Sequence, residues 1–475
     1  MIIVKWLLGL MPVAILCLMG GLHVGMGMAT GLFVGQRGLY GRSRFLPASN
    51  TPRYVRGAAH LPAWPFTMLF IAFPLWWILG LSDFIWLAAG GVMLLYLIRF
   101  RAVHVPRGFG LWLLFLIWVS FSGIQIDSSG RLLGFMYRFL IYVSVTAIFL
   151  YVYNSMALTG RKVLGNLVLL WGFVIVGGYL GIFFPTAEIK TPLAHFLPPS
   201  MLQNELLNQM AVRRLTQYNP DAWFQIDPRP SAPFLYTNNW GAAFSLLLPF
   251  VAAYLWHVRG ERKFWLVLAA VPVSIVPAVL TLNRGMFLGL GVALLYAGAR
   301  FAMAGNKRGV GTVFAFGMVS LVIVQLLPVA SRLQNRLSGS SSTADRGNLY
   351  SEAFTQTLSS PLLGFGAPRP SGTIGAPSVG TQGQFWMVLY SHGFVGAVLF
   401  TLTFFVLFLE TLRRSNPLVL AANTVLLVSL VEIFYYGMLT TGLVLMFVAA
   451  AVALKGPPLG DGVGSAAKHR NGVLP

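Results

Sequence analysis

Long apolar runs, separated by short polar segments, dominate the chain. Most of the runs approach or reach the roughly 18 to 20 residues that a helix needs to cross a bilayer. They cover residues 66–81, 84–97, 109–123, 135–153, 167–184, 239–256, 264–280, 286–299, 310–327 and 385–409. Their apolarity is nearly continuous, whereas a transmembrane barrel shows short alternating segments. The pattern predicts an all-α polytopic membrane protein.

The two ends of the chain leave the number of helices open. Residues 1–34 form an apolar run too long for one simple span, which predicts either one long helix or two short ones. Residues 418–454 predict two spans hinged near Gly437. We therefore expect about 12 to 14 transmembrane helices.

Two long polar stretches interrupt the apolar pattern, and they define the organisation of the chain. We expect N-terminal membrane helices over 1–184, a first long loop over 185–236 and further helices over 237–330. A second long loop follows over 331–383, then C-terminal helices over 384–454 and a polar tail over 455–475. The second loop has a potentially helical core around residues 349–358. Long loops between packed elements are either disordered or functional.

Composition and charge distribution fix the orientation. Apolar residues make up 57% of the chain, charged residues only 9%, and the net charge is +21. Lysine and arginine gather in short segments beside the apolar runs, which is the positive-inside pattern of cytoplasmic loops and not a nucleic-acid surface. Both long loops are then predicted on the outer face. The single cysteine, Cys17, excludes a disulfide framework or a cysteine-rich metal site within one chain.

Few polar residues lie within the predicted spans, which argues against a pore or carrier. Glu432 is the clearest mid-span acid. It is either a coupling site or a buried acid paired with an arginine such as Arg138 or Arg284, and we expect the pairing.

Three segments carry candidate chemistry at the predicted outer face. Arg284 stands at a helix start in TLNRGMFLGL, Arg346 precedes an amphipathic helix and a GFG turn, and TQGQFWMVLYSHGFVG leads into the next span. Each also has a purely structural interpretation: an interfacial anchor for Arg284, pairing with Asp345 or Glu352 for Arg346, and close helix packing for Gly393 and Gly396.

Together and in this order, these segments resemble the O-antigen ligase and Wzy-type polymerase superfamily of GT-C-type bacterial membrane glycosyltransferases. Asn239 opens a span in YTNNWGA as the family asparagine does, and Asn283-Arg284-Gly285 is similar to the family's Ser-Arg-Gly helix start. Residues 346–366 resemble its arginine, short helix and Gly-x-Gly turn, which falls on Gly364 and Gly366. The ligase pattern that ends in two spaced glycines falls on Gln382, Gly383, Gly393 and Gly396.

The resemblance implies transfer of a glycan from a polyprenyl pyrophosphate carrier to a saccharide or lipid-glycan acceptor, at the outer face of the bacterial cytoplasmic membrane and with inversion. Arginines bind phosphate bidentately without a metal, which suits a pyrophosphate leaving group. Arg284 and Arg346 are the first candidates for this role, followed by Arg213, Arg214, Arg229 and Arg336. We expect no metal and no cofactor, and the partners would be the lipid-linked donor, the acceptor and membrane lipids.

One departure from the family concerns the catalytic base. The family histidine that activates the acceptor hydroxyl is replaced by Gln382, and glutamine cannot take a proton at neutral pH. Asp345, Glu352 and His392 are candidate replacements; His392 is expected to lie too deep in its helix, so the loop acids rank first. Positioning and leaving-group stabilisation without a base is the other possibility.

Three alternative functions stay open at this point. The chain could be a peptidoglycan-type polymerase, although the acidic loop motifs of that class are not evident. It could be a lipid or polysaccharide transporter, or a catalytically inactive family member, which the glutamine at position 382 favours. The sequence does not name the sugar, the acceptor or the oligomeric state, and does not separate ligation from polymerisation.

Overall fold

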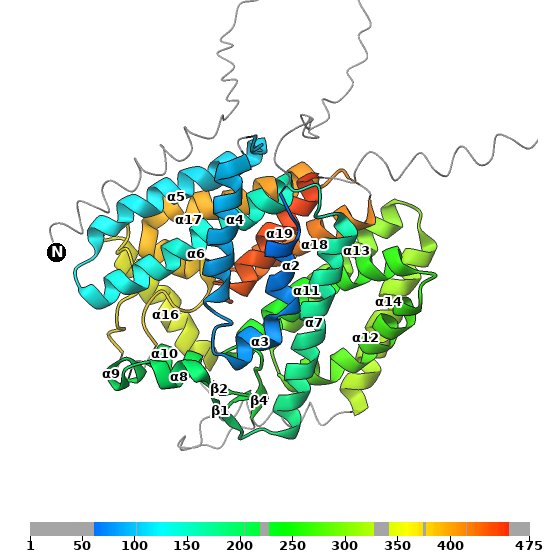
Figure 1. Ribbon diagram of the computed structural model, residues 1–475, viewed down its shortest axis with the longest axis horizontal. Coiled ribbons are helices and arrows are strands. Elements are labelled where there is room, and N and C mark those ends of the chain that lie inside the picture. Colours follow the sequence, from blue (N-terminus) through cyan, green and yellow to red (C-terminus); the bar gives the residue numbers. More distant parts are fainter. Residues whose placement is uncertain are drawn as a thin grey trace, which may run out of the picture.

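The computed structural model describes residues 61–100, 102–203, 205–218, 228–326, 342–373, 377–414 and 416–455. Within these ranges, eight helices are long and apolar enough to cross a membrane, and three shorter apolar helices accompany them (Figure 1). The predicted run over 1–34 and the tail after residue 455 lie outside the described residues.

Every predicted apolar run within the described ranges forms helix. The bounds are α2 Trp64–Ile71, α3 Phe73–Ile78, α4 Ile85–Phe100, α5 Gly110–Ser122, α6 Ser129–Asn154, α7 Gly160–Phe183, α11 Thr237–Val258, α12 Arg262–Leu280, α13 Arg284–Met303, α14 Lys307–Leu326, α17 Gln384–Thr411, α18 Pro417–Glu432 and α19 Thr441–Lys455. Short 3-10 turns, η1 (Arg107–Phe109) and η2 (Gly123–Gln125), flank α5. The predicted hinge near Gly437 is confirmed, because α18 ends at Glu432 and α19 starts at Thr441.

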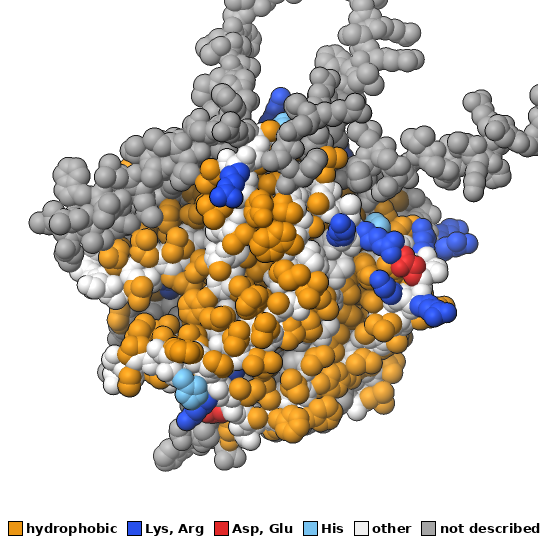
Figure 2. Space-filling view, viewed as in Figure 1, with side chains coloured by type: hydrophobic (Ala, Val, Ile, Leu, Met, Phe, Trp, Pro, Cys, Tyr) orange, Lys and Arg blue, Asp and Glu red, His pale blue; other side chains and the backbone are white. Residues whose placement is uncertain are grey.

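The core of the bundle lies around α19. All residues of α19 from Leu443 to Leu454 are buried, and the helix packs against α6, α11, α17 and α18. By contrast, α14 has no buried residue, and it lies beside α12 and α13 at the right of Figure 1. Apolar side chains cover most of the face seen in Figure 2. A helix that exposes apolar side chains along its length is suited to contact with lipid.

Basic residues gather at one end of the bundle, which we call the basic end. They flank the connections α6–α7, α11–α12, α13–α14 and α17–α18, and most of the Lys and Arg in view lie along the upper and right-hand rim of Figure 2. Two basic side chains at this end bind backbone carbonyls, one at the C-terminus of α19 and one in the connection after α6. Arg414 donates to the carbonyls of Ala453 and Leu454 at 2.8 and 3.0 Å, and the ammonium of Lys455 contacts the carbonyl of Leu158 at 3.0 Å.

The opposite end, which we call the loop end, carries the long connections. The first contains α8 (Pro192–Phe196), α9 (Pro199–Leu202) and α10 (Glu205–Ala211). It also contains two antiparallel pairs, β1 (Glu188–Lys190) with β2 (Val212–Arg214) and β3 (Thr216–Gln217) with β4 (Arg229–Pro230). The second contains α16 (Ser342–Thr357), which packs against α17. The helix expected around 349–358 is thus present, and it starts earlier than expected.

Candidate functional site

Asn283 joins three segments at the loop end. It occupies the N-cap position of α13 and is buried, but its side chain bonds to other segments and not to the helix end. Its amide nitrogen donates to the carbonyl of Thr237 at the start of α11, at 3.1 Å. Its amide oxygen accepts a hydrogen bond from the hydroxyl of Tyr436, in the connection between α18 and α19. The helix start that the sequence singled out is therefore a junction between α11, α13 and the α18–α19 connection.

Arg284 and Arg346 both lie next to this junction. Arg284, the first residue of α13, is exposed and stands between Asn283 and Gly285. The hydroxyl of Tyr435 donates to the Gly285 carbonyl at 3.2 Å. Burial raises the pKa of the Tyr436 phenol, the charge of Glu432 adds to this rise, and the charge of Arg346 opposes it. The start of α13 that carries Arg284 thus binds both Tyr435 and Tyr436, and the charge of Arg346 on α16 acts on Tyr436.

An aromatic stack, one turn from Arg346, holds α16 against α17. Tyr350, one turn further along α16, stacks on Trp386 of α17 with ring centroids 4.7 Å apart. The indole nitrogen of Trp386 donates to the carbonyl of Phe434 at 3.0 Å. Burial raises the pKa of Tyr350, and the charge of Arg346 opposes this shift. The orientation of α16, and with it the position of Arg346, is fixed by packing against α17, whose Trp386 in turn binds the α18–α19 connection.

The start of α17 is bound by the same connection. The backbone N–H groups of Gln384 and Phe385 donate to the carbonyls of Tyr436 and Ile433 at 2.7 and 2.8 Å. Gln384 also accepts from the N–H of Met438 at 3.1 Å and donates to the hydroxyl of Tyr142 at 3.3 Å. Gln382 lies two residues earlier, is half-buried, and makes no hydrogen bond to another described residue. Asn239 completes this region, donating to the Gly437 carbonyl at 3.5 Å.

The motif glycines form one structural joint. At Gly393 the φ angle is 70° and α17 is broken. The Gly-x-Gly turn enters this break: the N–H groups of Phe365 and Gly366 donate to the carbonyls of Tyr390 and Ser391 at 3.0 and 2.7 Å. Gly364 has a φ of 62°, and a Cβ there would lie 2.5 Å from the Tyr390 carbonyl. Close packing was the structural interpretation of Gly393, and the joint shows its physical reason.

A Cβ at Gly396 would lie 2.5 Å from the Cβ of His392, one turn earlier in α17. His392 itself is buried, and its Nδ1 lies 2.6 Å from the hydroxyl of Ser122. Rings of Phe115, Phe135 and Tyr142 surround it. The expectation that His392 lies too deep for a base at the outer face agrees with this placement.

Glu352, one of the two loop acids, is engaged in holding the second loop. Its carboxylate accepts from the hydroxyl of Ser371 at 2.6 Å, the N–H of Gly372 at 2.9 Å and the side-chain amide of Gln356 at 2.9 Å. Asp345 belongs to α16, but its side chain is outside the described residues, as is the whole of Arg336. Of the two loop acids, the structure therefore describes the surroundings of Glu352 alone.

The arginines of the first loop bind to other residues of that loop or to the turn between α3 and α4. Arg213 is buried and donates to Asp83 at 2.8 Å, whereas Arg214 forms an exposed ion pair with Glu188 at 2.8 Å. Arg229 donates to the side chain of Gln217 at 3.2 Å. These contacts give the three residues roles in holding the first loop together.

The pairing expected for Glu432 is wrong. Its carboxylate accepts from the hydroxyl of Ser245 at 2.6 Å and packs against Gly289, and no ion pair joins it to an arginine among the described residues. Sequence reasoning also missed Tyr435 and Tyr436, the residues at the centre of the site. The segment EIFYYGM carried a signal, since two adjacent tyrosines interrupt an apolar run.

Comparison with known proteins adds no identification. No family model matches the chain, and neither a curated protein nor a solved structure does so. The resemblance to O-antigen ligases and polymerases rests on the motifs given above.

Proposed function

We propose that the loop end transfers a glycan from a polyprenyl pyrophosphate carrier to a saccharide or lipid-glycan acceptor at the outer face of a bacterial cytoplasmic membrane. The observation that carries the proposal is that Arg284 directly follows Asn283 in the junction with Tyr436, while the charge of Arg346 from α16 acts on the same tyrosine. A pyrophosphate leaving group gains negative charge as the glycosidic bond breaks, and guanidinium groups stabilise that charge. The apolar surface of the bundle suits a substrate whose carrier stays in the membrane.

The acceptor is oriented by Gln382, whose amide can hydrogen-bond a hydroxyl but cannot take its proton. Glu352 already accepts three hydrogen bonds and His392 is enclosed by aromatic rings. Asp345 is therefore the candidate base in this proposal. A Gln382→His variant that transfers glycan no faster than the parent, at any pH, is the expected result if Asp345 or leaving-group stabilisation suffices.

The test is transfer by the purified chain in liposomes that contain a polyprenyl-pyrophosphate oligosaccharide and an acceptor. Mass spectrometry detects the new glycosidic bond. Loss of one preorganised charge stabiliser lowers a reaction rate about 100-fold to 1,000-fold. The transfer rates of Arg284→Ala and Arg346→Ala should each be lower than the wild-type rate by this factor. Arg308→Ala is the control, because Arg308 is an exposed arginine at the basic end.

Three results would oppose the proposal in different ways. Full activity of both arginine variants at normal folded levels would remove the assigned site. Transfer that requires added Mg²⁺ and stops in a chelator would contradict the metal-independent chemistry. Movement of the lipid-linked glycan across sealed vesicles without any new glycosidic bond would instead identify a transporter.

A further inference from the structure

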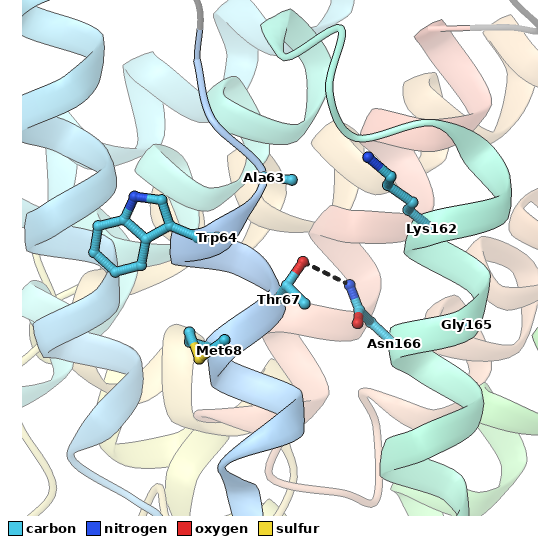
Figure 3. Close-up of a pocket in the computed structure, with 7 residues that line it drawn as sticks. All are labelled: Ala63, Trp64, Thr67, Met68, Lys162, Gly165 and Asn166. Carbon is cyan, nitrogen blue, oxygen red and sulfur yellow. Dashed lines mark hydrogen bonds between the residues drawn. The ribbon is translucent and has the colours of Figure 1, made fainter.

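A groove between α2 and α7 lies away from the loop end. It has a volume of about 430 Å³, and its lining includes Trp64, Met68, Lys162 and Asn166. Figure 3 shows Lys162 extending from the start of α7 towards α2, with the side chains of Thr67 and Asn166 facing each other below it. The proposed function assigns no role to these residues.

The groove has a charged rim and an apolar wall. Lys162 is exposed and its ammonium group contacts no carboxylate among the described residues. The neighbouring acid, Glu261, is already bound by Arg161, whose NH2 group lies 2.6 and 2.8 Å from its two carboxylate oxygens. The wall consists of Trp64 and Met68, which are 49% and 43% exposed. A cation without an acidic partner therefore stands over an accessible apolar surface.

Two polar side chains, Thr67 and Asn166, lie between the charged rim and the apolar wall of the groove. The amide of Asn166 donates to the hydroxyl oxygen of Thr67 at 3.3 Å. The second N–H of the amide and the hydroxyl hydrogen of Thr67 are still able to donate. Asn166 follows Lys162 by four residues, which places it about 6 Å deeper along α7. Charge, hydrogen-bond donors and apolar surface thus follow one another from the basic end into the bundle.

We infer that this groove binds an anionic phospholipid of the membrane leaflet at the basic end. The phosphate lies at Lys162, an ester carbonyl accepts a hydrogen bond from the Thr67–Asn166 pair, and an acyl chain lies along Met68 and Trp64. Charge complementarity selects an anionic headgroup, because basic pockets between membrane helices attract such lipids. The tryptophan and lysine at the rim are residue types that anchor proteins at a membrane interface. This inference does not rest on the proposed glycan transfer.

The experiment uses the full chain in nanodiscs that contain equal amounts of phosphatidylglycerol and phosphatidylcholine. Native mass spectrometry after transfer to detergent counts the lipids that stay bound. We expect wild-type protein to retain phosphatidylglycerol in preference to phosphatidylcholine. Lys162→Gln should reduce this retention about fivefold, the factor expected for one lysine near an anionic lipid surface, and Lys162→Arg should restore it.

Lys307→Gln is the matched control, since Lys307 is an exposed lysine that also stands at the start of a helix at the basic end. It should change retention less than twofold. An equal loss of phosphatidylglycerol retention in Lys307→Gln would show general charge attraction and would overturn the inference of a specific site. Displacement of the bound lipid by millimolar inorganic phosphate would show a site for a free anion. Equal retention of the two lipids by wild type, as expected if residues 1–60 of the chain fill the groove, would also overturn it.

Discussion

Asn283 and Tyr436 show how a single hydrogen bond places a candidate catalytic residue. Asn283 directly precedes Arg284, and its side chain binds both Thr237 and Tyr436. Because Arg284 is the next residue, these two hydrogen bonds also fix the backbone from which Arg284 projects. A position of this kind supports the site without contacting the substrate.

Asn283→Ala should lower stability by about 1 to 3 kcal/mol, because it leaves the buried Tyr436 hydroxyl without its partner. Tyr436→Phe removes that hydroxyl, and the double variant should be more stable than the sum of the two single losses predicts. Thermal unfolding in detergent of the four proteins measures this coupling. Strict additivity would show that the hydrogen bond does not contribute.

Arg213 and Arg214 are adjacent, yet their ion pairs differ in burial. The side chain of Arg213 is 2% exposed, whereas that of Arg214 is 49% exposed. Breaking a buried pair costs about 3 to 5 kcal/mol because a charge stays behind without compensation. An exposed pair contributes about 0 to 1 kcal/mol.

Arg213→Met should therefore detach the β1–β2 pair from the turn at Ser82 and Asp83, while Arg214→Met should leave the pair docked. Hydrogen exchange of residues 188–190 and 212–214 is the measurement. The first variant should exchange much faster than wild type, and the second at nearly the wild-type rate. Equal behaviour of the two variants would contradict the assigned role of burial.

At the scale of elements, the broken helix α17 and the Gly-x-Gly turn depend on each other. Gly393 has a φ of 70° and a ψ of −175°, a conformation essentially restricted to glycine. A Cβ there would also collide with the Leu362 carbonyl. Gly91 in α4 offers the opposite case, because an added Cβ there meets no atom within 4 Å.

Gly393→Ala should destabilise the chain by about 1 to 3 kcal/mol, and Gly91→Ala should be neutral or stabilise it by up to about 1 kcal/mol. Thermal unfolding in the same detergent compares the two. A Gly393→Ala protein as stable as Gly91→Ala would mean that α17 is not broken at this residue.

Arg131 joins the Gly-x-Gly turn to the start of α6. Arg131 donates to the carbonyls of Phe365 and Ala367 at 2.5 and 2.8 Å, and also to Asp127. Asp127 accepts a further hydrogen bond from Arg369 at 2.9 Å. The hydrogen bond from Arg131 lowers the pKa of Asp127 from its usual 3.8.

A lowered folded-state pKa means that the carboxylate stabilises the fold above pH 3.8 and loses this contribution as pH falls through the lower, folded value. The difference in unfolding temperature between wild type and Asp127→Asn should therefore be constant and small from pH 5 to 7. It should shrink towards zero below about pH 4. A difference that stays the same at pH 3 would show that the charge of Asp127 plays no part.

Long apolar runs predicted the helices because apolar character sustained over about 20 positions outweighs local detail. The predicted bounds of 385–409 and the found bounds Gln384–Thr411 show this agreement. The same continuity concealed the break at Gly393, since the apolar run extends across it. The junctions could not be predicted either, because the partners are far apart in the chain: Tyr436 binds Asn283 across 153 residues and Arg213 binds Asp83 across 130.

At the scale of the whole molecule, the two ends of the bundle differ in charge and in the length of their connections. Under the positive-inside rule we expect the basic end to face the cytoplasm, and this orientation would put Arg284 and Arg346 on the outer side, where the proposed lipid-linked glycan would meet them. The proposed function depends on this orientation, and the chain offers a direct test because it contains only one cysteine, Cys17.

After Cys17→Ser, single cysteines are introduced at two exposed positions: Ser359 after α16 at the loop end and Lys263 at the start of α12 at the basic end. In intact spheroplasts, a membrane-impermeant maleimide should label Ser359→Cys and leave Lys263→Cys unlabelled. Both should react once the membrane is permeabilised, which controls for accessibility. The opposite labelling pattern, with Lys263→Cys labelled and Ser359→Cys protected, would mean that the bundle has the inverse orientation. Arg284 and Arg346 would then lie on the cytoplasmic side, and the proposed function would fail.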